Sequence, residues 1–293
     1  MLEIFHISDL HIGKHTRLVQ KLLDKIQEKF KIGEQEHRYL IVTGDIVQDG
    51  TKRQFVRALK ALLPFKGKVM IVPGNHDYGV LGFMYSDHRA KNFDSLLTRG
   101  VGIDHEFFPN IPFLRLLEDG NGSRLLLIGL NSCSQTKSLL DIAKGEIGEG
   151  QLESLDKLLV DPNYSEIPTI VFLHHIPHRR AHGIGMSLKD YKKLMAVLKD
   201  RVEALIFGHE GDFDEIKNIS GKNLNIPIIA QKELKKVDET EIPVRAIKLR
   251  SGKSQGILYY LDANKTVVEQ ACYRISVDGT DMSAKSIWLD KEN

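Results

Sequence analysis

The sequence is poor in cysteine. Among 293 residues there are two, Cys133 and Cys272, and they lie far apart. Two isolated cysteines give no disulfide framework, and without a Cys-x-x-Cys spacing they argue against a cysteine-based metal site. We interpret both as buried apolar side chains in a reducing compartment.

The sequence also lacks an excess of charge of one sign. Lys and Arg number 41 and Asp and Glu 39, so the formal net charge is +2. This small charge argues against nucleic acid or a membrane surface as a partner. No apolar run approaches the ~20 residues of a membrane span, and the N-terminus lacks the basic region and cleavage site of a secretory signal. The sequence indicates a cytoplasmic protein and leaves its oligomeric state open.

Strand-like runs alternate with helical patterns over most of the chain, and only strand-like runs follow near its end. The alternating strands are expected over residues 2–8, 39–43, 68–72, 124–130, 169–173 and 204–207. The later strands are expected over residues 226–230, 244–249, 256–261 and 267–275. This order predicts an α/β fold: a layered sandwich of mixed β-sheets flanked by helices, completed by a β-rich C-terminal end. We expect a single domain over residues 1–293.

Polar clusters follow five of these predicted strands. In chain order they are Asp9-Leu10-His11, Gly44-Asp45, Gly74-Asn75-His76-Asp77, His174-His175 and Gly208-His209. Asp, Asn and His are ligands for divalent ions such as Mn, Fe and Zn. Because each cluster comes just after a strand, we expect the side chains to converge on one edge of a sheet. That is the layout of a two-metal phosphoester site.

The chemistry of a phosphodiester explains why such a site is needed. The phosphate is negatively charged and repels hydroxide, and two divalent ions ~4 Å apart can bind its oxygens and hold a hydroxide for in-line attack. Asp9 and His11 lie two residues apart, so both can turn toward one ion. Asp45, at the tip of the second strand, is the natural bridge between the ions. The other oxygen and nitrogen ligands would come from Asn75, His174 and His209.

In its motifs and their order the chain resembles the calcineurin-like metallophosphoesterases, from residue 2 to about residue 212. The most specific of these motifs is Gly74-Asn75-His76-Asp77 after an apolar strand. The resemblance implies two divalent metal ions. It assigns one ion to Asp9, His11 and Asp45, and the second ion to Asp45, Asn75, His174 and His209. His175 is an alternative to its neighbour as ligand, or a residue that supports the ligands.

The resemblance also implies a mechanism and two catalytic residues. A metal-bound hydroxide would attack phosphorus. His76 would hydrogen-bond the substrate or protonate the leaving oxygen, and Asp77 would orient the ring of His76.

The family pattern breaks at its last motif, which usually ends in a second histidine. Here Gly211 stands at that position, and glycine offers no ligand. Three outcomes are open: water fills the position and the first metal site is weak, Glu210 or Asp212 reaches in and makes a more oxygen-rich site, or the first site stays empty. An oxygen-rich site favours Mn or Mg over Zn, and we favour manganese.

The second motif continues as Ile46-Val47-Gln48-Asp49-Gly50, which differs from the serine/threonine phosphatase branch and is similar to class III cyclic nucleotide phosphodiesterases. The predicted substrate is a small phosphoester such as a cyclic nucleotide. Arg179 and Arg180 are candidates for binding its phosphate, since arginine can bind phosphate through two hydrogen bonds. The alternatives are a DNA or RNA nuclease of the same superfamily, and a non-catalytic metal-binding protein with a degenerate first site.

Overall fold

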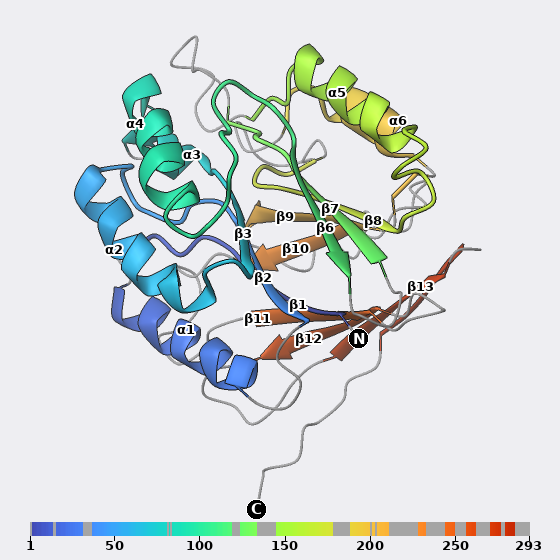
Figure 1. The fold of residues 1–293 in the computed structure, drawn as a ribbon, viewed down its shortest axis with the longest axis horizontal. Coiled ribbons are helices and arrows are strands. Elements are labelled where there is room, and N and C mark those ends of the chain that lie inside the picture. The colour runs from blue at the N-terminus through green and yellow to red at the C-terminus, as the bar shows by residue number, and fades with distance from the viewer. Residues whose placement is uncertain are drawn as a thin grey trace, which may run out of the picture.

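The computed structural model describes residues 2–13, 16–31, 37–80, 82, 84–118, 124–133, 145–177, 188–199, 201–202 and 204–210, together with five later strands (Figure 1). Of those strands the backbone alone is described. None of the helices in these ranges is long and apolar enough to cross a bilayer.

The larger sheet has seven strands and is mixed. Its parallel part joins β1 (Leu2–Ile7), β2 (Arg38–Thr43) and β3 (Val69–Val72), and β11 (Val244–Leu249) runs antiparallel on the other side of β1. Beyond β11 come three more antiparallel strands, β12 (Gly256–Leu261), β13 (Gln270–Ser276) and β14 (Gly279–Ala284). The C-terminal strands therefore extend the sheet that the first strand begins.

The smaller sheet has five strands in the order β10-β9-β8-β7-β6. The strands β7 (Arg124–Gly129), β8 (Thr169–Leu173), β9 (Ala204–Glu210) and β10 (Ile228–Lys232) are parallel, and β6 (Phe113–Glu118) pairs antiparallel with β7. A short hairpin of β4 (Gly79–Val80) and β5 (Met84–Tyr85) stands apart from both sheets.

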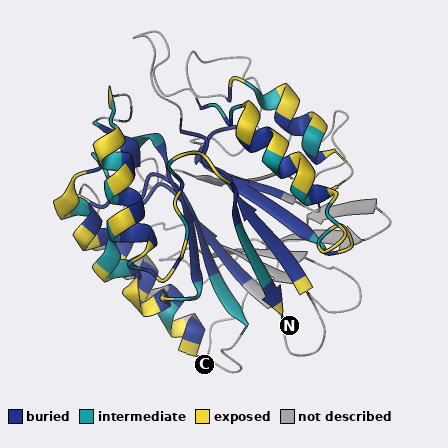
Figure 2. Cartoon of the chain, turned by 45° about the horizontal axis from the view of Figure 1, so that its top comes forward, coloured by how far each residue is buried: buried dark blue, intermediate teal, exposed yellow. Residues whose placement is uncertain are grey.

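Helices cover the outer faces of the two sheets, and the sheets face each other (Figure 1). On one side lie α1 (Thr16–Lys31), α2 (Lys52–Leu62), α3 (Asn75–Tyr78) and α4 (Asp87–Asn92), and on the other α5 (Glu149–Leu159) and α6 (Tyr191–Leu198). A 3-10 turn η1 (Leu63–Phe65) and a π-helical segment η2 (Phe93–Thr98) complete the helical part. Figure 2 shows buried strands between helices whose outer faces are exposed.

The two faces of the smaller sheet bury side chains in two separate cores. In β8, Ile170 and Phe172 belong to the core between the sheets, whereas Val171 and Leu173 pack with α5 and α6. This alternation is the period of two of a β-strand, applied to a strand that is apolar on both faces. It explains why β8 reads as a continuous apolar run in the sequence.

The predicted α/β sandwich with a β-rich end is confirmed, while some elements differ from the prediction. The strand β6 and the β4–β5 hairpin were not expected, because residues 78–121 carry mixed signals. The sequence Asp262-Ala263-Asn264-Lys265 also predicts a hairpin turn, and it lies outside the described residues. The expectation of a single domain stays a prediction.

The two sheets come close together at Gly129, the last residue of β7. A Cβ atom there would lie 2.8 Å from Cζ of Phe172 and 2.9 Å from Cγ1 of Val72, which belongs to the other sheet. Glycine at this position therefore sets how near β3 and β7 can come.

We expect the substitution Gly129→Val to lower the free energy of unfolding by about 1–3 kcal/mol, because it overpacks the core between the sheets. Urea titration measures this. The control is Gly150→Ala in α5, where no atom lies within 4 Å of the added Cβ. That change should stabilise by up to ~1 kcal/mol through helix propensity. If Gly129→Val had the same free energy of unfolding as the wild type, the sheets would be able to move apart at this point without loss of stability.

Candidate metal centre

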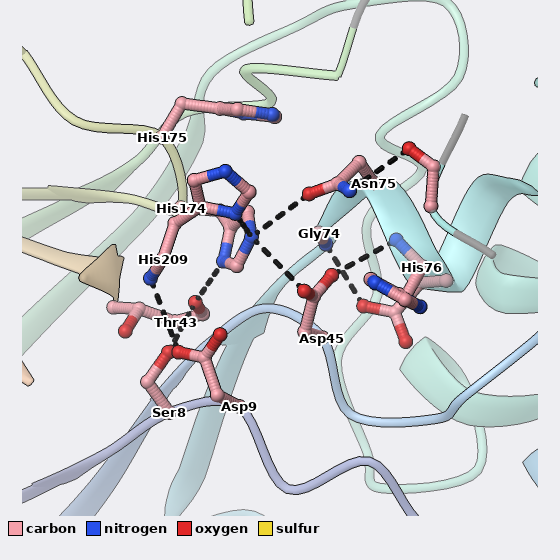
Figure 3. A network of polar contacts seen from close by, with 12 residues as sticks. Ser8, Asp9, Thr43, Asp45, Gly74, Asn75, His76, His174, His175 and His209 are labelled. Atoms are coloured by element: carbon pink, nitrogen blue, oxygen red, sulfur yellow. Dashed lines mark hydrogen bonds and ion pairs between the residues drawn. The ribbon is translucent and has the colours of Figure 1, made fainter. Parts of the chain in front are cut away.

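Five loops meet where the carboxyl ends of the strands of both sheets come together (Figure 3). The loop after β1 pairs with the loop after β2, since the main-chain N–H of Asp9 donates to the carbonyl of Gly44 at 3.1 Å and that of His11 to Asp45 at 2.9 Å. In the smaller sheet the N–H of Gly208 donates to the carbonyl of His174 at 3.1 Å. The loops are thus fixed by their backbones before any ligand binds.

The backbone of four predicted ligands is left-handed. The φ angles are 54° at Asp9, 44° at His11, 49° at Asp45 and 58° at His209, and these are the non-glycine residues with positive φ in the described part of the chain. Such residues are uncommon and cost about 1–3 kcal/mol each, so they persist where surrounding contacts enforce them. Asp9 and His11 follow β1, Asp45 follows β2, and His209 is the last residue but one of β9.

Two glycines allow these loops to pack closely. A Cβ atom on Gly74 would lie 2.2 Å from both the N and the Oδ1 of Asp45. Gly44 has a φ of +80°, and a Cβ atom on it would lie 2.6 Å from Nδ1 of His174. The glycines of both motifs therefore serve the approach of the ligand loops.

His174 connects the two sheets and points one nitrogen into the cluster. Its Nδ1–H donates to the carbonyl of Thr43 at 2.7 Å, which fixes the ring. Its Nε2 atom then lies 2.8 Å from Nδ1 of His209, 3.1 Å from Oδ1 of Asn75 and 3.4 Å from Oδ2 of Asp45. Figure 3 shows this convergence of nitrogen and oxygen atoms from four loops.

Two carboxylates are buried in the same place. The exposed fraction is 1% for Asp9 and 2% for Asp45. Asp9 accepts a hydrogen bond at 3.1 Å from the main-chain N–H of His209, and Asp45 one at 2.9 Å from that of His76. Buried carboxylates are stable only when cations or N–H donors compensate for the lost water.

The charges of Asp45 and His174 depend on each other. Burial alone would raise the pKa of Asp45, but the adjacent His174 imidazolium and its hydrogen bond hold this pKa well below its usual range. Burial would lower the pKa of His174, yet the Asp45 carboxylate raises it to about 9. Burial and the positive charge of His174 hold the pKa of His209 well below its usual range.

These residues fit a divalent ion. Asp9, Asp45, His174 and His209 each offer a ligand atom within 4.8 Å of the others, and His11, Asp45 and His76 form a second such group. Around Nε2 of His174 lie Nδ1 of His209, Oδ1 of Asn75 and Oδ2 of Asp45, all of which can donate an electron pair. A metal ion could take the place of the proton between His174 and Asp45. The donor set of carboxylate, imidazole and amide is one that Mn, Fe and Zn accept.

Comparison with known proteins agrees with this geometry. A model of the calcineurin-like phosphoesterase family matches residues 2–212. The chain belongs to the calcineurin-like phosphoesterase family. As a calcineurin-like phosphoesterase, it is a metal-dependent phosphoesterase, and the suspected resemblance is confirmed.

Two curated relatives are similar over most of the chain. One, from Vesicomyosocius okutanii, is named "Probable cyclic nucleotide phosphodiesterase"; it is 24% identical over 78% of this chain and 86% of its own length. The other is the 3',5'-cyclic adenosine monophosphate phosphodiesterase CpdA of Haemophilus influenzae, 23% identical over 71% of this chain and 69% of its own length.

Solved structures share the fold at lower identity. A dimetal phosphatase from Danio rerio superposes with a TM-score of 0.64 at 15% identity, over 94% of this chain and 99% of that one. GAP50, described as the anchor in the inner membrane complex of Plasmodium, gives a TM-score of 0.58 at 14% identity, over 99% and 91%. At these identities the likeness concerns the fold.

The structure brings the predicted ligands of this phosphoesterase together, but it groups them differently from the two sets that the family resemblance assigns. Asp9 groups with His174 and His209, whereas His11 groups with His76. The rings of His11 and His76 pack edge to face, with centroids 4.7 Å apart. Asp45 belongs to both groups, the position that a bridging ligand would need.

Of the two adjacent histidines, His174 faces the cluster. His175 is fully buried, and its Nδ1 atom lies 2.8 Å from the hydroxyl of Ser132. Its Nε2 atom has no hydrogen-bond partner among the described residues. The described residues do not include the position of Gly211, nor the side chains of the other candidates named from the sequence: Arg179, Arg180, Glu210 and Asp212.

The expected contact between Asp77 and the His76 ring is replaced by another. The carboxylate of Asp77 accepts hydrogen bonds from the main-chain N–H groups of Gly74 at 2.8 Å, Val47 at 2.9 Å and Ile46 at 3.3 Å. Asp77 is the third residue of the short helix α3, where a carboxylate turns back to the helix N-terminus. It joins the second and third ligand loops.

The ring of His76 is held by a residue that the sequence did not single out. Its Nδ1–H donates to the main-chain carbonyl of Gln48 at 2.8 Å. A main-chain carbonyl is present at every residue, so no side-chain pattern could have revealed this role. The same holds for the carbonyl of Thr43 beside His174.

We expect metal binding to release about one proton at pH 7, because an ion must displace the proton of His174, whose pKa lies near 9 in the metal-free protein. Affinity should therefore rise with pH up to about 9 and weaken as His174 is protonated below it. Calorimetry of manganese binding in buffers of different ionisation enthalpy measures the released protons. Binding without proton release would contradict the Asp45–His174 ion pair.

We expect Asp77→Ala to destabilise the protein by about 3 kcal/mol or more, because it leaves buried N–H groups without acceptors. The loss should appear in thermal unfolding of the metal-free protein. If Asp77 served only to orient His76, the variant would keep its stability and lose only turnover. Asp49→Ala is a control, since Asp49 is half-buried and bonds to Gln54.

Proposed function

We propose that this protein hydrolyses a small phosphodiester, with a cyclic nucleotide as the substrate class. The observation that carries the proposal is the buried group of Asp9, Asp45, His174 and His209 at the junction of the two sheets. Both curated relatives are named as cyclic nucleotide phosphodiesterases. We place the activity in the cytoplasm and favour manganese as the ion.

The proposed ligand sets are those that the family resemblance assigns. One ion would be held by Asp9, His11 and Asp45, and the other by Asp45, Asn75, His174 and His209. Bound ions would supply Lewis acidity, which neutralises the phosphate charge and lowers the pKa of a water molecule. The protein provides the fixed geometry, since the ligand loops are held by main-chain hydrogen bonds.

His76 has the geometry of a proton donor. Because its Nδ1–H is bound to the Gln48 carbonyl, its Nε2 atom is the nitrogen left for a substrate. In the imidazolium form Nε2–H would donate to a phosphate oxygen or to the leaving alkoxide. The main-chain N–H of His76 donates to Asp45, so the catalytic histidine and the bridging carboxylate are positioned together.

We expect Asp45→Asn to abolish turnover, because the bridge would hold both ions. His76→Ala should lower turnover by about 10²–10⁴-fold, the usual contribution of a general acid, with the metal content kept. The measurement is hydrolysis of 3',5'-cyclic AMP and of bis-p-nitrophenyl phosphate by metal-stripped protein titrated with manganese.

The outcomes separate the proposal from its rivals. Activity that rises with manganese and disappears in Asp45→Asn supports the phosphodiesterase. Loss of metal from His76→Ala would contradict its role as a proton donor. Full metal binding without turnover on either substrate would favour a non-catalytic protein, and the shared fold of the anchor protein GAP50 shows that fold alone does not decide this.

A further inference from the structure

We propose that Gly82, between the strands of the β4–β5 hairpin, is a positioning residue for the metal centre. Its main-chain carbonyl would select which end of the Asn75 amide faces the ion. The inference rests on the proposed function, since it takes Asn75 as a ligand. It adds a residue that none of the ligand motifs contains.

The evidence is a pair of contacts on opposite ends of one amide. Nδ2 of Asn75 donates to the carbonyl of Gly82 at 2.9 Å. Oδ1 of Asn75 lies 3.1 Å from Nε2 of His174, inside the cluster. Figure 3 shows the oxygen of the Asn75 amide on the side of His174.

The two ends of an amide are almost equal in size but opposite in chemistry. The oxygen accepts and can bind a cation, whereas the NH₂ group donates and cannot. A carbonyl only accepts, so the end of Asn75 that faces Gly82 must be the NH₂ group. The oxygen is thereby directed at the metal centre. Without Gly82 either end could face the ion.

The local fold brings this carbonyl back to the helix that carries Asn75. The hairpin follows α3 directly and closes through pairing of Gly79 with Tyr85 and Val80 with Met84. The N–H of Ser86 then donates to the carbonyl of Tyr78 at 2.9 Å, which fixes the hairpin against the end of α3. Gly82 itself is buried.

Only glycine fits at this position. Its φ is +77°, and a Cβ atom would lie 2.4 Å from Nδ2 of Asn75 and 2.7 Å from Nε2 of His76. A side chain would push the amide out of place and crowd the nitrogen that His76 presents to a substrate. The absence of a side chain therefore serves both the ligand and the proton donor.

The test compares Gly82→Ala with Gly67→Ala in the full-length protein. Gly67 has nearly the same φ, +76°, but no atom lies within 4 Å of its added Cβ. Both variants place an alanine at nearly the same positive φ, and only the Cβ of Gly82→Ala meets Asn75. Manganese binding to the metal-stripped proteins is measured by calorimetry, and thermal unfolding of the same samples reports the strain.

We expect Gly82→Ala to lower the affinity for one of the two manganese ions by about 10–100-fold, the range found when a group that orients a ligand is lost. Gly67→Ala should bind manganese like the wild type. In an Asn75→Ala background, Gly82→Ala should cause no further loss, because the amide it orients is gone. Equal binding by the two alanine variants, or independent losses from Asn75→Ala and Gly82→Ala, would overturn the proposal.

A second measurement applies if Gly82→Ala fails to fold. The NMR signal of the Asn75 side-chain NH₂ group is assigned in the wild-type protein by its loss in Asn75→Ala. Its protons should exchange slowly with solvent, both in the metal-free protein and in the protein loaded with zinc. Fast exchange in both states would refute the contact. Manganese binding without hydrolysis of any phosphodiester would overturn the proposed function and leave the role of Gly82 to be decided by the affinities. Absence of manganese binding by the wild type would overturn both.

Discussion

Two carboxylates buried between the sheets, Asp9 and Asp45, impose the main constraint on this molecule. A carboxylate removed from water needs a cation or hydrogen-bond donors close by. Main-chain N–H groups of His209 and His76 supply part of this compensation, and protonated His174 supplies the positive charge. The surrounding loops are arranged around that need, which is also the need that a bound metal ion would meet.

The position of this centre follows from the strand order. Parallel strands of both sheets end on the same side, so loops distant in sequence meet there without long connections. The hydrogen bond from His174 to Thr43 crosses from one sheet to the other. The close approach of Gly129 in β7 to Val72 in β3 is a second point where the two sheets meet.

The sequence revealed the site residues better than it revealed their contacts. Apolar runs followed by Asp, Asn and His mark strand ends, and that signal predicted the sandwich and gathered Asp9, Asp45 and His174 at one edge. Asp77 was misinterpreted because its motif position beside His76 suggested contact, whereas helix α3 turns it toward main-chain N–H groups. The supporting carbonyl of Gln48 leaves no trace in residue type, because every residue has one. The weak strand β6 was missed because its exposed and buried positions do not alternate cleanly.

The left-handed backbone of the four predicted ligands has an evolutionary consequence. Each one costs folding free energy that a glycine at the same place would not, so selection for stability alone would replace them. Two of the four, Asp9 and Asp45, are also buried carboxylates, so the centre combines two features that each lower the stability of the fold. A drifting, non-binding descendant of this protein should therefore lose these residues first and gain thermal stability as it does so.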